Sequence, residues 1–410
     1  MRGLRMLLYC HNALGLGHLV RTGAIAAAIR RQDPSVDVLV VTGAQITIPE
    51  LFPDNVAYVK LPSARLCSTN GQVTAAAAHM SLPFHDLRTL RAAIIKTVVT
   101  DFRPDACLVD HNPAGFYNEL DPAISAYRQL CPNGKLILGM RGIAYGGSDD
   151  EDYVKKYSSY LRTVYDKVLV YVDPSILDIR SIMSPEIAAK VEYTGYVTRV
   201  DAVARKPRSF ESSVAKRTIV LAAGSGSVGY PMMQRVIEAL GEGAEPTWQV
   251  LIVTGPYMDN RDVAALHHQI SHLPSLQLAR IVRVADDVRQ LLSSADLFIG
   301  QAGYNTLVEV MATGCPAIVV PYETLHREQL AHALLLEQRG LVSVIRENEL
   351  TASLLLSAIR RRLGSPPATA LGRVDLDGAD RAAKCVLDLA RPTSLPPNEE
   401  RGESTCGHST

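Results

Sequence analysis

The stretch that decides the fold spans residues 296–329 and reads DLFIGQAGYNTLVEVMATGCPAIVVPYETLHREQ. Its first residues predict the end of a short buried strand, and Gly300–Gly303 form a corner where backbone can approach a ligand closely. Residues 305–311 then alternate at helical spacing, Gly314 ends that helix, and Ala317–Val320 is another apolar strand. A strand, a glycine turn, a helix and a strand in this order put helix amides at the carboxyl edge of a parallel sheet, where anions and nucleotides bind.

Three side chains of this stretch are predicted to face that edge. Glu309 lies one turn into the helix, so its carboxylate can reach vicinal hydroxyls beside the glycine corner. Glu328 and Gln329 follow the strand end marked by Pro321. A capping box with Thr306 is the alternative for Glu309, because Thr-x-x-Glu is also a helix-start pattern. The register of the whole stretch favours ligand binding over the capping box.

The stretch resembles the donor-binding half of GT-B glycosyltransferases, and most closely the MurG-like group, which includes the N-acetylglucosaminyltransferase of peptidoglycan synthesis. The resemblance implies that Gly303, Tyr304 and Asn305, in the glycine corner and the first helical turn, hold the diphosphate of a nucleotide sugar. It also implies that Glu309 binds the ribose, and that the Glu/Gln pair at 328 and 329 binds sugar hydroxyls.

Composition narrows the class of protein. A chain of 410 residues predicts two domains, each large enough for its own core. Lys+Arg 42 balance Asp+Glu 42, which argues against a broad nucleic-acid surface. Although 47% of residues are hydrophobic, no apolar run approaches the length of about 18 residues that a transmembrane helix needs. The seven scattered cysteines lack Cys-x-x-Cys spacing, so reduced thiols in a cytoplasmic protein without a metal site are expected.

Short apolar runs recur along the chain, separated by segments long enough to form a helix. This alternation predicts parallel, doubly wound sheets. In the first half, strands are expected at 5–10, 36–42, 56–60, 106–110, 135–140, 168–172 and 191–194. In the second half, strands are expected at 218–223, 249–254, 279–284, 297–299 and 317–320. Leu19–Arg31 is predicted to be an amphipathic helix, whereas Ser63–Phe84 has few regular signals and is predicted to be a long loop.

The domain boundaries follow from breaks in this alternation. Residues 1–200 are expected to form an acceptor-binding Rossmann-like domain and 215–376 a nucleotide-sugar-binding one. The segment 201–214 between them is basic and rich in proline and serine, as a linker would be. Residues 377–391 predict a last helix that crosses back to the first domain, and 392–410 are expected to be disordered.

A second glycine turn, GLGH at residues 15–18, follows the first strand and opens the first helix. The helix dipole disfavours a cationic His18, and a neutral imidazole can take a proton from an acceptor hydroxyl at pH 7. The motif resembles the Gly-x-Gly-His start of the MurG-like group, which implies that Gly17 and His18 face the donor pyrophosphate. The alternatives are a His18 that only caps and packs, and His11 as the base.

A third glycine turn spans Gly224–Gly229 and has the Gly-x-Gly-x-x-Gly spacing of a dinucleotide fingerprint. No acidic residue ends the next strand, so the turn is interpreted as a diphosphate site, with Gly224, Ser225, Gly226 and Ser227 as its contacts.

By position, Val284 and Ala285 match the segment that sandwiches the uracil in the MurG-like group. A buried strand end is the competing interpretation of their side chains. Asp110 and Arg141 end strands of the first half, where each would either contact an acceptor or cap a loop.

Two Asp-x-Asp patterns, at 150–152 and 375–377, resemble the metal site of the other large glycosyltransferase fold. Each precedes or opens a helix, where acidic residues complement the dipole or cap it, so no metal site is assigned.

Together these features predict α/β architecture with two Rossmann-like domains facing each other across a cleft, the GT-B arrangement. The resemblance implies an inverting, metal-independent glycosyltransferase without a cofactor, with a UDP-linked sugar as donor, His18 as base and a small-molecule or lipid-linked acceptor. Peripheral membrane contact is compatible with this interpretation. The alternatives are a non-hydrolysing UDP-sugar epimerase and a non-catalytic nucleotide-sugar binding protein, and the residues leave the sugar and acceptor open.

Overall fold

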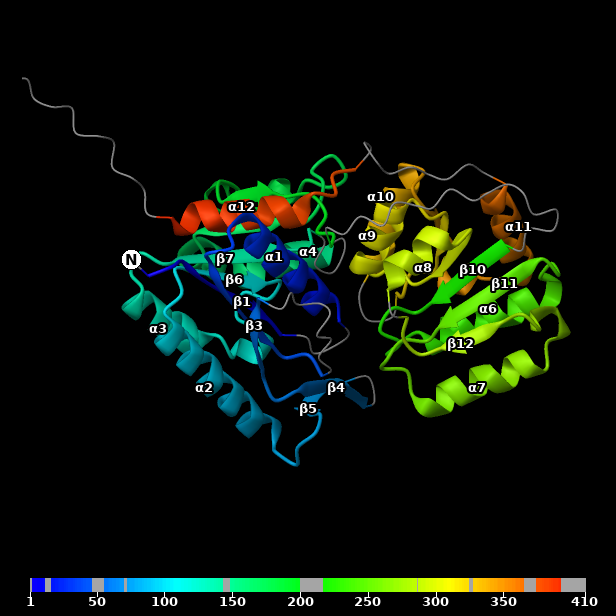
Figure 1. Cartoon of the computed structure of the whole chain (residues 1–410), viewed down its shortest axis with the longest axis horizontal. Coiled ribbons are helices and arrows are strands. Elements are labelled where there is room, and N and C mark those ends of the chain that lie inside the picture. The colour runs from blue at the N-terminus through cyan, green and yellow to red at the C-terminus, as the bar shows by residue number, and fades with distance from the viewer. Residues whose placement is uncertain are drawn as a thin grey trace, which may run out of the picture.

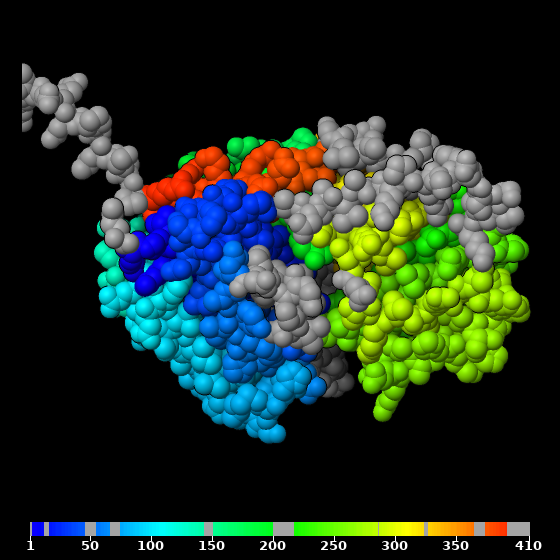
Figure 2. Space-filling view, viewed as in Figure 1, coloured from blue at the N-terminus to red at the C-terminus, as the bar shows by residue number. Residues whose placement is uncertain are grey.

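The computed structural model describes residues 2–11, 16–45, 55–69, 72–142, 148–199, 217–285, 287–323, 327–364 and 374–391. These residues form two lobes, each built on its own sheet (Figure 1). In the space-filling view the lobes are two adjoining masses, the blue to cyan amino-terminal one and the green to yellow carboxyl-terminal one (Figure 2).

The amino lobe contains a seven-stranded sheet of described residues, in the spatial order β3-β2-β1-β6-β7-β8-β9, and all neighbours pair in parallel. Its strands are β1 (Arg5–Cys10), β2 (Asp37–Thr42), β3 (Ala57–Lys60), β6 (Ala106–Asp110), β7 (Lys135–Met140), β8 (Lys167–Val170) and β9 (Val191–Tyr193). Its α-helices are α1 (Gly17–Gln32), α2 (Phe84–Phe102), α3 (Asp121–Leu130), α4 (Ser148–Ser159) and α5 (Pro185–Ala188).

The carboxyl lobe contains a six-stranded parallel sheet of described residues, in the order β12-β11-β10-β13-β14-β15. Its strands are β10 (Arg217–Ala222), β11 (Trp248–Val253), β12 (Arg280–Val282), β13 (Leu297–Gly300), β14 (Ala317–Val319) and β15 (Ser343–Val344). Its helices are α6 (Tyr230–Gly243), α7 (Asn260–Ser271), α8 (Val288–Ser294), α9 (Tyr304–Thr313), α10 (Glu328–Gln338) and α11 (Ala352–Leu363). Both sheets confirm the predicted doubly wound architecture, because long crossovers connect parallel neighbours.

The apolar core explains why these runs become strands and how the lobes are joined. β1 and β6 are buried nearly throughout, as strands covered on both faces should be. One cluster of buried apolar side chains includes both strands and continues across the junction into α9 and α10. A second cluster fills the far face of the carboxyl lobe beneath α6 and α11. The lobes are therefore packed together along the α9 side of the second sheet.

The last helix, α12 (Gly378–Ala390), packs on α1, β6 and β7 of the amino lobe, beside α1 in Figure 1. Its start is tied to the chain that leaves β9, since the Tyr196 amide donates to the Asp375 carbonyl and the Gly378 amide to the Tyr196 carbonyl. Asp377 occupies the N-cap position, as predicted, but its side chain makes no capping hydrogen bond. Both the linker predicted at 201–214 and the tail predicted at 392–410 lie outside the described residues.

Two predictions for the amino lobe are wrong. The segment Ser63–Phe84 contains an antiparallel hairpin, β4 (Ala64–Thr69) and β5 (Gln72–Ala77), in place of a long loop. Small residues give little hydrophobic alternation, so the pairing left no periodic signal. Leu19–Arg31 lies within α1 but is not amphipathic, because its small residues are buried between the sheet and α12.

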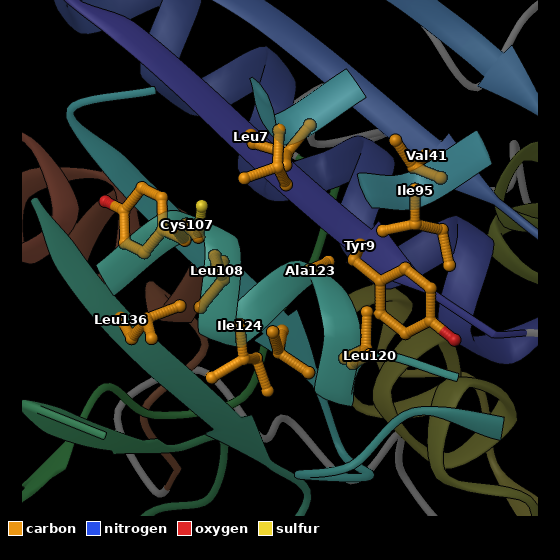
Figure 3. A pocket seen from close by; sticks show the side chains of 13 residues that line it. Leu7, Tyr9, Val41, Ile95, Cys107, Leu108, Leu120, Ala123, Ile124 and Leu136 are labelled. Atoms are coloured by element: carbon orange, nitrogen blue, oxygen red, sulfur yellow. The ribbon is translucent and has the colours of Figure 1, made fainter. Parts of the chain in front are cut away.

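A small cavity lies inside the amino lobe, on the sheet face covered by α2 and α3 (Figure 3). Its lining is mainly apolar and comprises Leu7, Tyr9, Val41, Ile95, Val99, Cys107, Leu108, Val109, Leu120, Ala123, Ile124, Tyr127 and Leu136. None of the predicted site residues lines it, so the cavity belongs to the core. Among the described helices, none has the length and apolarity to cross a membrane.

Candidate functional site

Several of the predicted site residues lie where the carboxyl ends of the two sheets approach each other. Asn305 at the start of α9 donates from Nδ2 to the carbonyl oxygen of Gly17, at 2.9 Å, so the two lobes touch at the first turns of α1 and α9. Helix α1 has no side-chain cap, and neither have α6 and α9. The backbone N–H groups that begin these three helices therefore have no capping side chain, and such uncapped N–H groups can bind an anion.

His18 is the second residue of α1 and is held by Asp110 at the end of β6. His18 Nδ1 lies 2.5 Å from Asp110 Oδ2. An ionised carboxylate only accepts hydrogen bonds, so Nδ1 carries the proton and Nε2 carries the lone pair in a neutral ring. Burial lowers the pKa of His18 below its usual value, against the opposing effect of the Asp110 hydrogen bond. The imidazole is thus in the form that a general base needs at neutral pH.

Arg21, one turn further along α1, holds the other side of Asp110. Its Nε donates to Oδ1 at 2.8 Å and its Nη2 to Oδ2 at 2.6 Å, a bidentate pair. Burial would raise the pKa of Asp110, but the Arg21 charge and the His18 hydrogen bond lower it below its usual value. Only 3% of Asp110 is exposed, and both of its carboxylate oxygens are bound by His18 and Arg21. The carboxylate therefore has no free face with which to contact an acceptor.

Glu309 lines a small pocket between the lobes. The pocket is bounded by α1, α8, α9 and the segment that leaves β9, through Val20, Val197, Thr198, Arg199, Arg289, Asn305, Val308, Glu309 and Ala312. Glu309 Oε1 lies 3.9 Å from Arg199 Nη2, and 18% of its side chain is exposed. Burial raises the pKa of Glu309 to about 7, with the charges of Arg199 and Arg289 opposing the shift. A half-neutralised buried carboxylate facing a pocket is typical of a functional site.

The capping-box interpretation of Glu309 is wrong. Helix α9 begins at Tyr304 with Gly303 as its N-cap, so Thr306 lies inside the helix and cannot cap it. At the other end Gly314 adopts φ 65° and closes the helix as predicted. The Glu309 carboxylate is therefore not used to start the helix.

The Gly224–Gly229 turn joins β10 to α6. Gly224 and Gly226 have φ of 60° and 89°, which only glycine adopts easily. A Cβ at Gly226 would lie 2.3 Å from the Thr254 carbonyl oxygen, so the turn is pressed against the end of β11. The hydroxyls of Ser225 and Ser227 lie 3.4 Å apart in a part of the turn that reaches solvent. Their diphosphate role stays a prediction.

The side chain of Tyr304 does not lie where a contact with the donor diphosphate would place it. Its side chain is 5% exposed, donates from the hydroxyl to the Tyr171 carbonyl at 2.6 Å and accepts from the Val197 amide at 3.1 Å. The phenol is therefore enclosed between the lobes, and only the Tyr304 amide remains as a donor toward a diphosphate.

Glu328 and Gln329 open α10. Glu328 Oε1 lies 2.8 Å from Arg141 Nη1, which joins the two lobes, and Gln329 Oε1 accepts the Tyr322 amide at 3.1 Å. Arg141 Nη2 also contacts His111 Nε2 at 3.1 Å, so this guanidinium connects the predicted sugar site to the histidines around Asp110.

The segment predicted to bind uracil does not form a buried strand end. β12 stops at Val282, and Val284 lies beyond it with 55% of its surface exposed, while Ala285 is half-buried. An exposed apolar side chain at a strand edge remains compatible with stacking on a base. Among the residues that the structure describes, no group of three or more His, Cys, Asp or Glu side chains could hold a metal ion.

Comparison with known proteins relates the carboxyl lobe to one glycosyltransferase family. Residues 219–370 match the family model "Glycosyltransferase family 28 C-terminal domain", the half that carries the Gly224 turn, Glu309 and Glu328. The chain has the GT-B fold and is similar to the MurG-like glycosyltransferases. It is 31% identical over 185 residues to the UDP-N-acetylglucosamine--N-acetylmuramyl-(pentapeptide) pyrophosphoryl-undecaprenol N-acetylglucosamine transferase of Sorangium cellulosum, covering 43% of this chain and 44% of that protein. The MurG-like chain thus spans about half the length, or less, of such curated relatives.

The solved structures agree on the fold of the whole MurG-like chain. The crystal structure of MurG from Acinetobacter baumannii aligns with a TM-score of 0.60 at 15% identity, over 94% of this chain and 99% of that one. A crystal structure of UDP-N-acetylglucosamine 2-epimerase also has a TM-score of 0.60, at 12% identity, over 94% of this chain and 95% of that one. At these identities the likeness shows the GT-B fold and leaves the reaction to other evidence.

Sequence reasoning missed three polar residues of this MurG-like site. Arg21 follows His18 by three positions, the spacing that puts two side chains on one helix face, and this signal could have found it. Arg199 and His111 lie on irregular segments near strand ends, and no local pattern predicts that His111 adopts φ 68°. A strained backbone at such a strand end is typical of functional sites.

Proposed function

We propose that this chain is a glycosyltransferase that moves a sugar from a nucleoside diphosphate sugar, with UDP as the favoured nucleotide, to an acceptor hydroxyl. The donor would bind the carboxyl lobe and the acceptor the amino lobe. The observation that carries the proposal is the contact between α9 and α1. This contact brings the Glu309 pocket next to the start of α1, where Gly17 and His18 lie. The family 28 match and the curated relatives, which are named as N-acetylglucosamine transferases, support the same class of reaction.

The residues supply each part of an inverting transfer. His18 Nε2 would accept the acceptor proton while that hydroxyl oxygen attacks the anomeric carbon, and the carbon–oxygen bond to the diphosphate would break on the opposite side. Asp110 would stabilise the imidazolium that forms. The departing diphosphate would be stabilised by the uncapped amides that open α6 and α9. In this mechanism helix amides supply the charge stabilisation that a metal ion gives in other transferases, so no metal or cofactor is required.

Recognition of the donor would be divided along the carboxyl lobe. Glu309 would accept hydrogen bonds from the ribose hydroxyls, and Glu328 with Gln329 would bind the transferred sugar. Arg141 reaches Glu328 from the amino lobe, so the sugar site includes residues of both lobes. A lipid-linked acceptor is compatible with the printed names of the relatives, and a small soluble acceptor with the residues alone.

A UDP-sugar epimerase is the second candidate, because proteins with that printed function share the fold at the same TM-score. The two reactions give different products: transfer yields UDP and a glycosylated acceptor, whereas epimerisation yields an altered sugar nucleotide. Incubation with a panel of sugar nucleotides, with UDP release and thermal shift measured together, tests both. UDP release that rises when an acceptor mixture is added supports transfer, whereas a new sugar nucleotide formed without acceptor supports epimerisation. A thermal shift with neither product would leave a binding protein and overturn the enzyme proposal.

A further inference from the structure

Arg21 is enclosed between two aromatic rings that belong to different lobes. The centre of its guanidinium lies 5.6 Å from the ring of Tyr171, which follows β8 in the amino lobe, and 5.3 Å from the ring of Tyr304, which opens α9 in the carboxyl lobe. Both distances are within the range of cation–π attraction. Arg21 is 2% exposed, and besides these rings its guanidinium contacts Asp110 and His18, with Nη2 lying 3.3 Å from His18 Nδ1.

Tyr304 is itself fixed by both lobes. Its hydroxyl donates to the Tyr171 carbonyl and accepts from the Val197 amide. Its ring lies 5.8 Å from that of Tyr196, whose hydroxyl lies 2.8 Å from His332 Nε2 on α10. The ring against Arg21 is therefore held by contacts that exist only when the lobes are docked.

Arg21 also sets the charge beside His18. A buried Asp110 alone would attract a proton to the imidazole, because an unbalanced negative charge favours the cationic ring. The bidentate guanidinium cancels that charge without blocking the hydrogen bond from His18 Nδ1. The titratable and charged groups that face His18 are Asp110 from β6, Arg21 from α1, Arg141 from the end of β7, His11 from the end of β1, and His111. Tyr304 reaches this group through Arg21, from across the junction.

We propose that Arg21 and Tyr304 are positioning residues, through which docking of the carboxyl lobe fixes and charge-balances Asp110 and so keeps His18 neutral and oriented. The catalytic part of this inference rests on the proposed function, in which His18 is the base. Tyr304 then acts through its side chain on the far lobe, and not on the donor diphosphate as the family resemblance implied. The burial and lowered pKa of His18 agree with this arrangement.

The test measures His18 directly. In protein labelled with ¹⁵N-histidine, the tautomer and the titration of His18 are followed by NMR, with the His18→Gln variant used to assign its signals among the 11 histidines. Arg21→Gln should move the titration of His18 to higher pH, because Asp110 is no longer balanced. Tyr304→Leu should move it in the same direction by a smaller amount, whereas Tyr304→Phe, which keeps the ring, should leave it close to that of the native chain.

Two further variants keep the test decisive. Arg21→Gln leaves a buried carboxylate without its partner and can unfold the chain, in which case Arg21→Lys, which keeps the charge but loses the bidentate contact, replaces it. Tyr127→Phe removes a buried phenol at the opposite end of β6 and β7, where its hydroxyl contacts Asp105 and Lys135 carbonyls, and serves as the matched control. A folded Tyr304→Leu with an unchanged His18 titration would overturn the role of Tyr304. An unchanged His18 titration in a folded Arg21→Gln chain would overturn both roles. Because Arg21→Lys keeps the charge and loses only the bidentate contact, its readout is the tautomer of His18, and native ring-nitrogen shifts of His18 in that variant would overturn both roles as well.

Kinetics separate this inference from the proposed function. If the chain is a transferase, Tyr304→Leu should lower kcat on the order of 10-fold and leave UDP affinity within about 3-fold. Weaker UDP binding with unchanged kcat would instead return Tyr304 to the donor site and overturn the inference. Because the NMR titration needs no substrate, a shifted His18 in a chain without transferase activity would reject the proposed function and leave the positioning roles standing.

Discussion

Arg141 of the amino lobe and Glu328 of the carboxyl lobe form an ion pair across the junction, with Nη1 and Oε1 2.8 Å apart. The pair is mostly buried, with 20% and 14% of the two side chains exposed. Glu328 is thus held by the amino lobe at the position where the donor sugar is proposed to lie. A sugar that binds Glu328 would also contact or displace Arg141, so donor binding in the carboxyl lobe would be felt by a side chain of the amino lobe.

Glu328→Gln should therefore act on the sugar and spare the nucleotide. We expect a higher KM for the sugar nucleotide, about 10-fold, since hydrogen bonds to charged groups contribute roughly 1.5–3 kcal/mol. Inhibition by UDP, which lacks the sugar, should stay nearly unchanged. Initial-rate kinetics with UDP as competitor measure both constants. If the affinities for the sugar nucleotide and for UDP fall equally, Glu328 does not bind the sugar.

Glu309→Ala should weaken UDP binding about 10- to 100-fold while the fold is retained. The reason is the loss of a carboxylate that accepts hydrogen bonds from ribose hydroxyls, because Glu309 takes no part in capping α9. Calorimetric titration with UDP gives the affinity, and a thermal melt of the free variant checks folding. Replacing Glu238, an exposed acid on α6, by Ala provides the control. Native UDP affinity in Glu309→Ala would reject the ribose assignment.

Glu309 should also make stability depend on pH. Its folded pKa is about 7, above the ordinary value of 4.5, so the folded chain binds this proton more tightly than the unfolded chain does. Stability from this group is full below pH 4.5 and falls as pH rises toward 7. Glu309→Gln should therefore raise the free energy of unfolding at pH 8 by up to about 3 kcal/mol and have little effect near pH 4.

Denaturant unfolding of both chains at the two pH values measures that difference. Glu238→Gln removes an exposed charge from the same lobe and should show no such pH dependence. A Glu309→Gln variant that is equally or less stable than the native chain at pH 8 would mean that the carboxylate is well solvated or well paired in the free protein.

The sequence predicted the sheets and the donor-side motifs because these depend on local pattern. In a strand–turn–helix unit such as Gly300–Gly314, the apolar periodicity, the glycine turn and the glycine that ends the helix all lie within one short window of sequence. The β4–β5 hairpin was missed because its small and polar residues give no such alternation, and its pairing is with another segment of the chain.

The junction between the lobes could not be predicted from local pattern. Arg21 meets Asp110 across 89 positions of sequence and Arg141 meets Glu328 across a still longer separation, so neither pair leaves a mark in a window of sequence. Tyr304 was assigned to the diphosphate because it follows the glycine corner, whereas tertiary packing turns its ring toward the other lobe. Residues at the start of a helix are predictable, but the directions of their side chains depend on what packs against them.

His18→Ala should lower turnover on the order of 100- to 10,000-fold, because it removes the proposed base. UDP affinity should be roughly retained, since the amides of α6 and α9 and the Glu309 carboxylate stay in place. In the native chain, turnover should fall only at pH values below the usual histidine range, because the pKa of His18 is lowered and the base must be neutral. Normal turnover in His18→Ala would place the base elsewhere, with His11 as the next variant to measure.

The last prediction concerns metal, which separates two chemistries that use the same donors. A metal-dependent transferase needs carboxylates that converge on a cation bridging the two phosphates. Asp150 and Asp152 lie near the start of α4, in the amino lobe, where the helix dipole favours acids. Asp375 and Asp377 lie where the chain enters α12, and both contact Arg381. Neither pair belongs to the Gly224 or Gly303 turns, whose amides are proposed to carry the charge of the leaving group.

Turnover should therefore persist in excess EDTA, and the double variant Asp150→Asn with Asp152→Asn should keep it within a few-fold. The assay measures UDP release from the donor found in the substrate panel, before and after chelation and after adding manganese or magnesium back. Glu309→Ala, which is expected to weaken donor binding, provides a variant with reduced turnover for comparison in the same assay. Activity that vanishes with chelation and returns with either cation would overturn the metal-independent mechanism, because helix amides alone would then not stabilise the departing diphosphate.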